Sequence, residues 1–167
     1  VAFSSEGNRW RARVESAGVR LPLFLPLDLS GEVAGEGDRV SGRLGPLALG
    51  GSWGQLGLKL SPTPLQVGSL EGEGRLLGGR LQAHLRYASP YTGFPLWVWQ
   101  EGGAYRFQTP HGEGEYRGGA LALRLRDLPI HALDEFRLSG QALYRDGELS
   151  GRLALKGRYL EAEGNLR

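Results

Sequence analysis

The chain contains neither cysteine nor methionine, and only two lysines, Lys59 and Lys156. Without cysteine there is no disulfide bond, no thiolate nucleophile and no cysteine ligand for a metal. No apolar run approaches the roughly 20 residues that a membrane-spanning helix requires. Because the sequence lacks an initiating methionine and starts within an amphipathic pattern, we expect it to be a fragment of a longer, repetitive protein.

The residues that are present predict one folded domain over 1–167. The 167 residues are 40% hydrophobic and 23% charged, which is too apolar for a disordered chain. Arginines alternate with acidic residues to give a net charge of +2, so no basic block indicates a nucleic-acid partner. The preference for arginine and leucine is typical of a GC-rich genome, such as that of a thermophile.

Apolar residues alternate with polar ones along most of the chain, which is the period of a β-strand with one apolar face. The alternation covers 9–15, 19–29, 55–60, 80–87, 120–126, 136–144, 149–155 and 160–166. The predicted apolar face contains Val19, Leu21, Leu23, Leu25, Leu27, Leu29, Leu56, Leu58, Leu60, Leu81, Leu85, Leu121, Leu123, Leu125, Phe136, Leu138, Leu149, Leu153, Leu155 and Leu160. Pro22 and Pro26 cannot donate ladder hydrogen bonds, so the sequence predicts an edge strand or a bulged strand over 19–29.

Glycine pairs separate the alternating runs. Tight hairpin turns are predicted at 50–51, 78–79, 102–103, 118–119 and 146–147. Consecutive strands should therefore be antiparallel neighbours, roughly ten to twelve of them, in a meander. The pattern of 72–86 recurs forty positions later in 112–126, which indicates a repeated hairpin unit. Residues 128–135, with Pro129 near their start, predict a turn or a single helical loop.

The motifs of the common enzyme classes are missing. Three widely separated histidines, His84, His111 and His131, predict no metal site. The chain contains no G-x-S-x-G nucleophile motif, and strand-like alternation, not a helix, follows the glycines at 72–78 and 112–118. We therefore expect no catalytic residue, no metal and no cofactor.

Aromatic residues cluster between positions 91 and 107. Such a cluster is typical of a carbohydrate or membrane-interface platform, or of a strand that is covered on both faces. The residues are Tyr91, Phe94, Trp97, Trp99, Tyr105 and Phe107.

The leucine face leaves two folds open. If the sheet closes, the leucines fill the core of a β-sandwich or barrel, which would be a structural or interaction module of the cell envelope. If the sheet curls without closing, they line the concave face of a half-pipe. A lining with few polar groups suits acyl chains better than a ligand that needs directional hydrogen bonds.

The C-terminal third resembles a known family. Its sequence is similar to the repeat of TamB-type translocation and assembly module proteins and their AsmA-like relatives. The matching features are the segment Leu128-Pro129-Ile130, a short turn, the segment Leu138-Ser139-Gly140 and the hairpin around Asp146-Gly147. The likeness is clearest over 119–167.

This resemblance implies a curled antiparallel β-groove, or β-taco, in a periplasm-spanning protein. It further implies an inner-membrane anchor outside this fragment, and a role in phospholipid transport, outer-membrane biogenesis and protein secretion. The implied partners are phospholipid acyl chains and outer-membrane β-barrel assembly proteins. In the isolated fragment, open strand edges predict a dimer formed by edge pairing.

Overall fold

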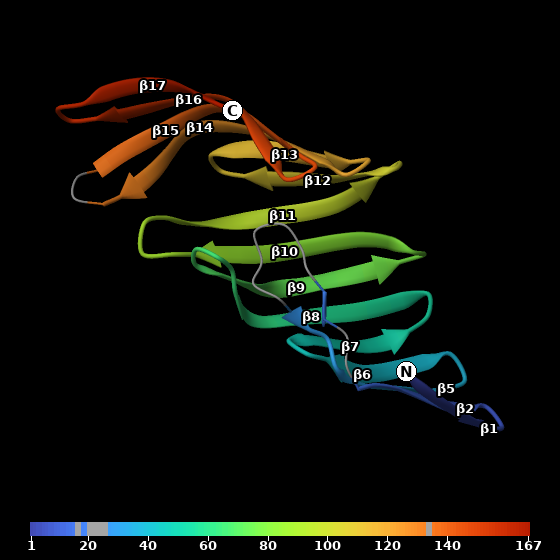
Figure 1. Ribbon diagram of the computed structural model, residues 1–167. Coiled ribbons are helices and arrows are strands. Elements are labelled where there is room, and N and C mark those ends of the chain that lie inside the picture. Colours follow the sequence, from blue (N-terminus) through green and yellow to red (C-terminus); the bar gives the residue numbers. More distant parts are fainter. Residues whose placement is uncertain (16–17, 20–26, 133–134) are drawn as a thin grey trace. The chain divides into compact units, whose positions relative to one another are not determined.

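The protein is all-β in the residues that the computed structural model describes, which are 1–15, 18–19, 27–132 and 135–167. These residues form seventeen strands and no helix (Figure 1). Nothing in this part of the chain is a helix with the length and hydropathy that a membrane crossing requires. The expected fold class is confirmed.

Fifteen strands follow one another in a single antiparallel meander, which confirms the predicted order but exceeds the ten to twelve strands that the sequence predicted. Their order is β1-β2-β5-β6-β7-β8-β9-β10-β11-β12-β13-β14-β15-β16-β17, while β3 and β4 pair in a separate two-stranded sheet. The order is open, because β1 and β17 each have only one neighbour in it. An open meander replaces the closed sandwich or barrel as the fold.

The contacts within the chain group it into two compact units, residues 1–86 and 87–167. A single domain over 1–167 therefore stays a prediction. The first unit contains β1 (Ala2–Glu6), β2 (Arg9–Val14), β3 (Gly18–Val19), β4 (Leu27–Asp28), β5 (Gly31–Glu36), β6 (Arg39–Leu44), β7 (Leu47–Ser52), β8 (Gln55–Pro64), β9 (Ser69–Leu77) and most of β10 (Arg80–Ala88).

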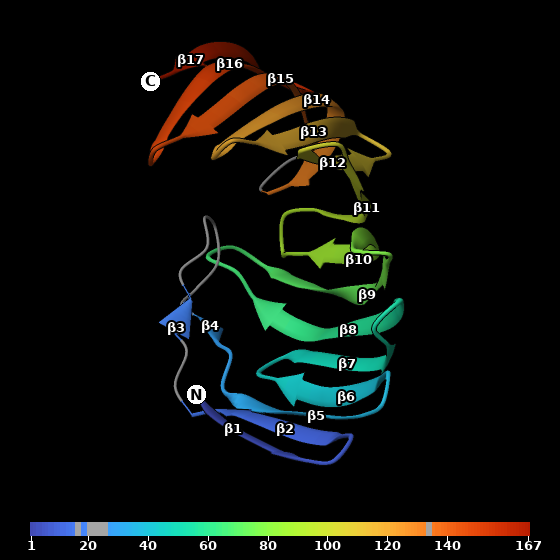
Figure 2. The same ribbon diagram turned by 90° about the vertical axis from the view of Figure 1, so that its right-hand side faces the viewer.

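The second unit contains the remaining strands. These are β11 (Gly93–Glu101), β12 (Ala104–Thr109), β13 (Gly112–Arg117), β14 (Ala120–His131), β15 (Glu135–Arg145), β16 (Glu148–Gly157) and β17 (Glu161–Leu166). Within each unit the strands are curved and twisted rather than flat (Figure 2).

Four of the five predicted hairpin turns are confirmed, at 78–79, 102–103, 118–119 and 146–147. The turn predicted at Gly50-Gly51 is wrong, because both residues lie inside β7 and the chain turns at Trp53-Gly54. Close packing against the neighbouring strand, not a turn, requires glycine at position 51. A Cβ there would meet the carbonyl oxygen of Gln55 and lie 3.4 Å from Cα of Leu56 on the neighbouring strand.

The single strand predicted over 19–29 is also wrong. Val19 and Leu27 are antiparallel partners, as are Gly18 and Asp28, so the chain has reversed direction between β3 and β4. One continuous strand would have carried two prolines that lack a ladder donor. Figures 1 and 2 show β3 and β4 in front of one face of the first unit's main sheet.

The turn or helical loop predicted at 128–135 is a strand over most of its length, because β14 extends to His131. A bulge precedes this extension: the register shifts between Leu125 and Leu128, and Asp127 has a φ of +50°. Beyond the bulge, β14 has passed the end of β13, and among the described residues its strand pairing continues with β15 alone. A proline is tolerated at such an edge, which explains Pro129 within a strand.

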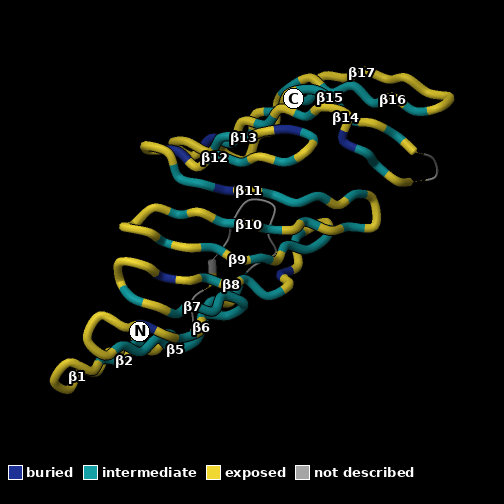
Figure 3. The backbone as a smooth tube through the Cα atoms, turned by 180° about the vertical axis from the view of Figure 1, so that it is seen from behind, coloured by how far each residue is buried: buried dark blue, intermediate teal, exposed yellow. Residues whose placement is uncertain are grey.

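Only a few of the described residues are buried (Figure 3). Those with a side chain are Val40, Leu56, Thr63, Val98, Ala104, Ala120 and Leu128. The protein exposes 11380 Å² to solvent. A compact protein of this mass would expose about 8,100 Å², and two separate compact halves about 9,700 Å². The sheets therefore do not enclose a core of the usual size.

Candidate apolar binding face

The strand register of the first unit places apolar residues and glycines on one face. Trp10, Gly35, Val40, Gly51 and Leu56 lie side by side across five strands. Two parallel rows continue this face along the strands. Their residues are Ala12, Val33, Gly42, Leu49, Leu58 and Gly74, and then Val14, Gly31, Leu44, Leu47, Leu60 and Gly72.

The second unit repeats this arrangement. Val98, Phe107, Gly114, Leu123, Ala142, Gly151 and Leu166 form one row across the strands. The next rows contain Thr109, Gly112, Leu125, Gly140, Leu153 and Gly164, then Leu128, Leu138, Leu155 and Ala162, then Ile130, Phe136 and Gly157. Thr109 is the one residue in these four rows with a polar side chain.

Glycines on this face make room for side chains of the neighbouring strand. A Cβ at Gly114 would lie 2.8 Å from Cδ2 of Leu123, and one at Gly72 would lie 2.8 Å from Cδ2 of Leu85. Leucine side chains therefore lie across the glycines of the adjacent strand. The result is an apolar surface that carries no reactive group.

Most of the leucines predicted for the face are half-buried, as expected for a face that is crowded but not enclosed. Of the remainder, Leu56 is buried, whereas Leu149 and Leu160 are 43% and 53% exposed. Leu160 lies outside the strands, just before β17. The half-buried residues are Leu27, Leu29, Leu58, Leu60, Leu81, Leu85, Leu121, Leu123, Leu125, Phe136, Leu138, Leu153 and Leu155. The prediction that Leu27 and Leu29 belong to this face is wrong, because Leu27 lies in β4 of the separate two-stranded sheet and Leu29 lies outside the strands.

Some predicted residues cannot be placed. Leu21, Leu23 and Leu25, together with the side chain of Val19, lie outside the described residues. That the predicted residues line a ligand groove stays a prediction.

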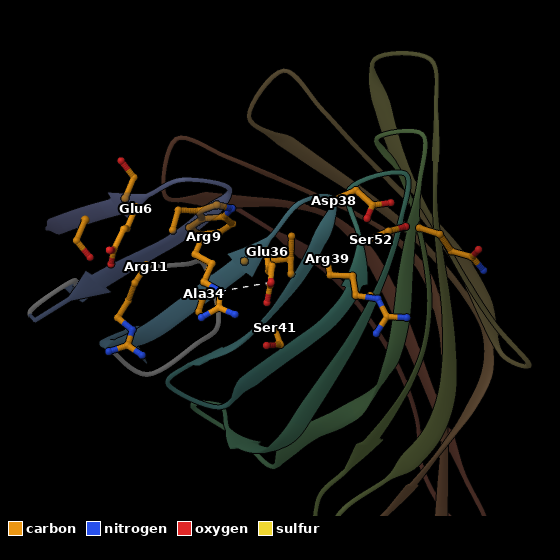
Figure 4. A pocket seen from close by; sticks show the side chains of 16 residues that line it. Glu6, Arg9, Arg11, Ala34, Glu36, Asp38, Arg39, Ser41 and Ser52 are labelled. Carbon is orange, nitrogen blue, oxygen red and sulfur yellow. Dashed lines mark ion pairs between the residues drawn. The ribbon is translucent and has the colours of Figure 1, made fainter.

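The opposite face of the first unit is polar. Arg9 pairs with Glu36 at 3.3 Å, and Arg11 pairs with Glu32 at 3.0 Å, each across the β2–β5 pair. A hollow of about 1280 Å³ lies over β1, β2, β5, β6, β7 and the start of β8, and it is lined mainly by residues of this side, together with Trp10, Gly35, Val40 and Gly51. Figure 4 shows charged and hydroxyl side chains around it, with Arg39 among them.

The polar face of the second unit carries a chain of ion pairs. Arg106 lies 3.0 Å from Glu101 and 3.3 Å from Glu115, and Glu115 also pairs with Arg117 at 2.9 Å. A hollow of about 660 Å³ lies over β11–β16 beside these residues. Oppositely charged side chains that neutralise one another leave no strong field for a charged ligand.

In the part of the chain that the structure describes, no three His, Asp or Glu residues are grouped so that they could hold a metal ion. Sequence reasoning missed one pair, in which His131 Nδ1 lies 3.8 Å from Glu135 Oε1; both side chains are exposed. The spacing of four residues between His131 and Glu135 is the sequence feature that could have indicated this pair.

The aromatic cluster of 91–107 does not form a single platform. Val98 and Phe107 are partners on the apolar face, whereas Trp99 faces Arg106 on the polar side. Trp97 shares that polar side and is 42% exposed, so the strand is not covered on both faces there. Tyr116, which the sequence analysis did not single out, lies beside Tyr105 on the apolar face. The sequence feature that could have identified Tyr116 is its position two residues before the predicted Gly118-Gly119 turn.

Comparison with known proteins provides no relative. No family model, no curated protein and no solved structure matches the chain. The sheet order and the two faces define the structural class of the protein, which is an open antiparallel β-meander with one apolar and one polar face.

Proposed function

We propose that the chain is a non-enzymatic segment that holds the acyl chains of phospholipids on its apolar face. The observation that carries the proposal is the half-burial of this face. Leucines of a closed core would be buried almost completely, whereas here eleven of the predicted residues in the strands of the meander are only half-buried. An apolar surface of this extent is typical of an interaction site.

The chemistry of the face favours a lipid over a more functionalised ligand. Its rows contain leucine, glycine, valine, alanine and phenylalanine, and the ion pairs lie on the other side of the sheet. A ligand that needs directional hydrogen bonds would find few partners here. An acyl chain needs only apolar contact, which contributes roughly 0.8 kcal/mol for each buried methylene.

The wider role that we propose follows from the resemblance to TamB-type proteins. The segment would belong to a periplasm-spanning protein, anchored in the inner membrane outside this fragment, that takes part in phospholipid transport and outer-membrane biogenesis. Outer-membrane β-barrel assembly proteins would be its protein partners.

Two measurements on the purified chain test lipid binding. Mass spectrometry of an organic extract should find co-purified phospholipid, and a fluorescent fatty acid should be taken up by the delipidated protein. Leu123→Arg places a charge in the centre of the second unit's face, next to Gly114 and Ala142. We expect uptake by the second unit's face to fall by at least tenfold.

The neighbouring position provides a matched control. Ala122 is exposed on the polar face of the same strand, so Ala122→Arg adds the same charge without changing the apolar face. Circular dichroism should show the parent's strand signal for both variants. An extract without lipid, together with no uptake by the parent chain, would count against the proposal.

A second candidate function, an interaction module, is favoured by the end strands. All five residues of β1 are exposed, and only Glu6 among them is charged, so this edge has little of the charge that normally prevents strand addition. We infer that β1 pairs with a strand of another chain, and that the isolated fragment dimerises. Light scattering should detect the dimer in the parent, and Ser5→Pro, which removes a backbone N–H on the open side of β1, should weaken it.

The two candidates have separable outcomes. Ser5→Pro changes the edge strand β1 of the first unit, whereas the leucine rows tested by Leu123→Arg belong to the second unit, so it should leave acyl uptake by those rows unchanged. A monomer at all concentrations would contradict the edge interaction and leave the lipid proposal standing.

A further inference from the structure

A row of tyrosines runs along one border of the second unit's apolar face. Tyr105 and Tyr116 are direct partners, Tyr116 faces Leu121, and Leu121 faces Tyr144. Each tyrosine lies two residues from a tight turn, at 102–103, 118–119 or 146–147. The row therefore marks the border of the apolar face next to these turns.

The tyrosine rings are partly accessible, and their hydroxyl groups are unused. Tyr105 is 37% exposed, Tyr116 is 39% exposed and Tyr144 is half-buried. Within the described residues, none of the three hydroxyls makes a hydrogen bond to the protein. Each ring extends the apolar surface while its hydroxyl remains available as a donor, the combination that places tyrosine at membrane–water interfaces.

Behind the tyrosines, the face is apolar over a length that fits an acyl chain. Along β15 the face runs from Tyr144 through Ala142, Gly140 and Leu138 to Phe136. The eight steps from residue 136 to residue 144, at about 3.4 Å each, span about 27 Å. One leaflet of a bilayer has a hydrocarbon depth of about 15 Å, so a phospholipid tail fits along the strands with its head at the tyrosine row.

The charges at this border are mixed. Arg145 faces Glu148 across the β15–β16 pair, and Arg117 is paired with Glu115. A headgroup would therefore be recognised through hydrogen bonds to the oxygens that all glycerophospholipids share, not through its net charge.

On the basis of the proposed lipid binding, we propose that Tyr105, Tyr116 and Tyr144 orient the bound phospholipid. Their hydroxyls donate hydrogen bonds to its phosphate or ester oxygens, and its tails lie along the strands toward Leu138 and Phe136. The tyrosine row thus selects glycerophospholipid over plain hydrocarbon and fixes the direction in which the molecule lies.

The test removes the three hydroxyls and keeps the rings. The triple variant Tyr105→Phe, Tyr116→Phe, Tyr144→Phe is compared with Tyr159→Phe, which changes an exposed tyrosine outside the strands. Two probes are used: phosphatidylethanolamine transferred from vesicles of that lipid, and diphenylhexatriene, a fluorescent hydrocarbon without a headgroup. We expect the triple variant to bind phosphatidylethanolamine about tenfold more weakly and to take up diphenylhexatriene within twofold of the parent.

Every outcome decides between the two proposals. If the triple variant binds both probes as the parent does, or loses both equally, the tyrosines do not recognise the headgroup and this inference fails. A parent that takes up diphenylhexatriene but no phosphatidylethanolamine also overturns it. If the parent takes up neither probe, the proposed function itself fails.

Discussion

Phe136 lies across Gly157, its partner on the neighbouring strand. A Cβ built on Gly157 would come within 2.5 Å of both Cδ1 and Cε1 of the phenyl ring. The ring therefore covers the backbone that glycine leaves bare, an arrangement that stabilises glycine-containing strands. The same relationship holds in the first unit, where the indole of Trp10 lies over Gly35.

Gly157→Ala should expel the phenyl ring. We expect the free energy of unfolding to fall by about 1–2 kcal/mol, measured by urea denaturation. Gly164→Ala is the matched control, because a Cβ there meets nothing within 4 Å. That substitution should be neutral or stabilise by up to about 1 kcal/mol. Equal effects of the two substitutions would show that the ring does not depend on this glycine.

The forty-residue repeat makes a paired prediction about Gly72 and Gly112. Their φ angles are +154° and +155°. A Cβ would lie 2.7 Å from Cα of Leu85 in the first case and 3.2 Å from Cα of Leu125 in the second. Alanine at either position should therefore cost about 2 kcal/mol or more in unfolding free energy. Gly50→Ala, where a Cβ has open space, should cost much less. A large cost at only one of the two positions would contradict structural equivalence of the repeats.

Alternation and turn residues suffice to predict the strand class, the antiparallel order and four turns. They suffice because a period of two and a glycine pair are local properties of a hairpin. The errors arise where a strand partner distant in the sequence determines the local structure. Pro129 looks like the start of a helical turn, yet the strand partners Leu138 and Phe136 hold its neighbours in β14. Val19 and Leu27 belong to one alternating run, yet they pair with each other.

The candidate face could be predicted in composition but not in exposure. Leu149 follows the same alternation as Leu153 and Leu155, yet it is exposed because it lies at the border of the face beside Tyr144. Exposure depends on what covers a position, and strand period contains no information on that. The tyrosine row depends on the strand register, which places Tyr105 opposite Tyr116, and the alternation pattern alone does not predict that pairing.

Thr63 is the most deeply buried polar residue in the described part of the chain, at 1% exposure, and it lies at a bulge in β8. The register shifts between Leu60 and Thr63, and the Thr63 hydroxyl donates to the carbonyl oxygen of Ser61 at 2.8 Å. Thr63→Val keeps the shape and removes this donor, which should cost about 1 kcal/mol. Hydrogen exchange of the Ser61 amide, which donates to Pro46, should accelerate.

Thr63→Ser separates the hydrogen bond from packing. Serine keeps the hydroxyl and loses one methyl group, so stability should fall while the Ser61 amide stays protected. Acceleration of exchange in Thr63→Ser but not in Thr63→Val would mean that the methyl group, not the hydroxyl, holds the bulge.

Glu113 and Arg126 form a two-pronged pair on the polar face, with Nη2 to Oε2 at 2.8 Å and Nη1 to Oε1 at 3.0 Å. The strand register places Arg124, not Arg126, opposite Glu113, so the pair is diagonal. The hydrogen bonds from Arg126 hold the pKa of Glu113 below its ordinary value, with the charge of Arg124 contributing least. A lowered carboxyl pKa stabilises the folded state above the unfolded pKa, and that contribution is lost as pH falls through the folded pKa.

Carbon-detected NMR titration of the glutamate carboxyls should therefore show Glu113 protonating at a lower pH than an isolated glutamate. Arg126→Gln removes the ionic partner and should return the pKa of Glu113 close to its ordinary value. Arg124→Gln, at the register-paired position, should raise it much less. A larger rise with Arg124→Gln would mean that the directly opposite arginine, and not the diagonal one, stabilises the carboxylate.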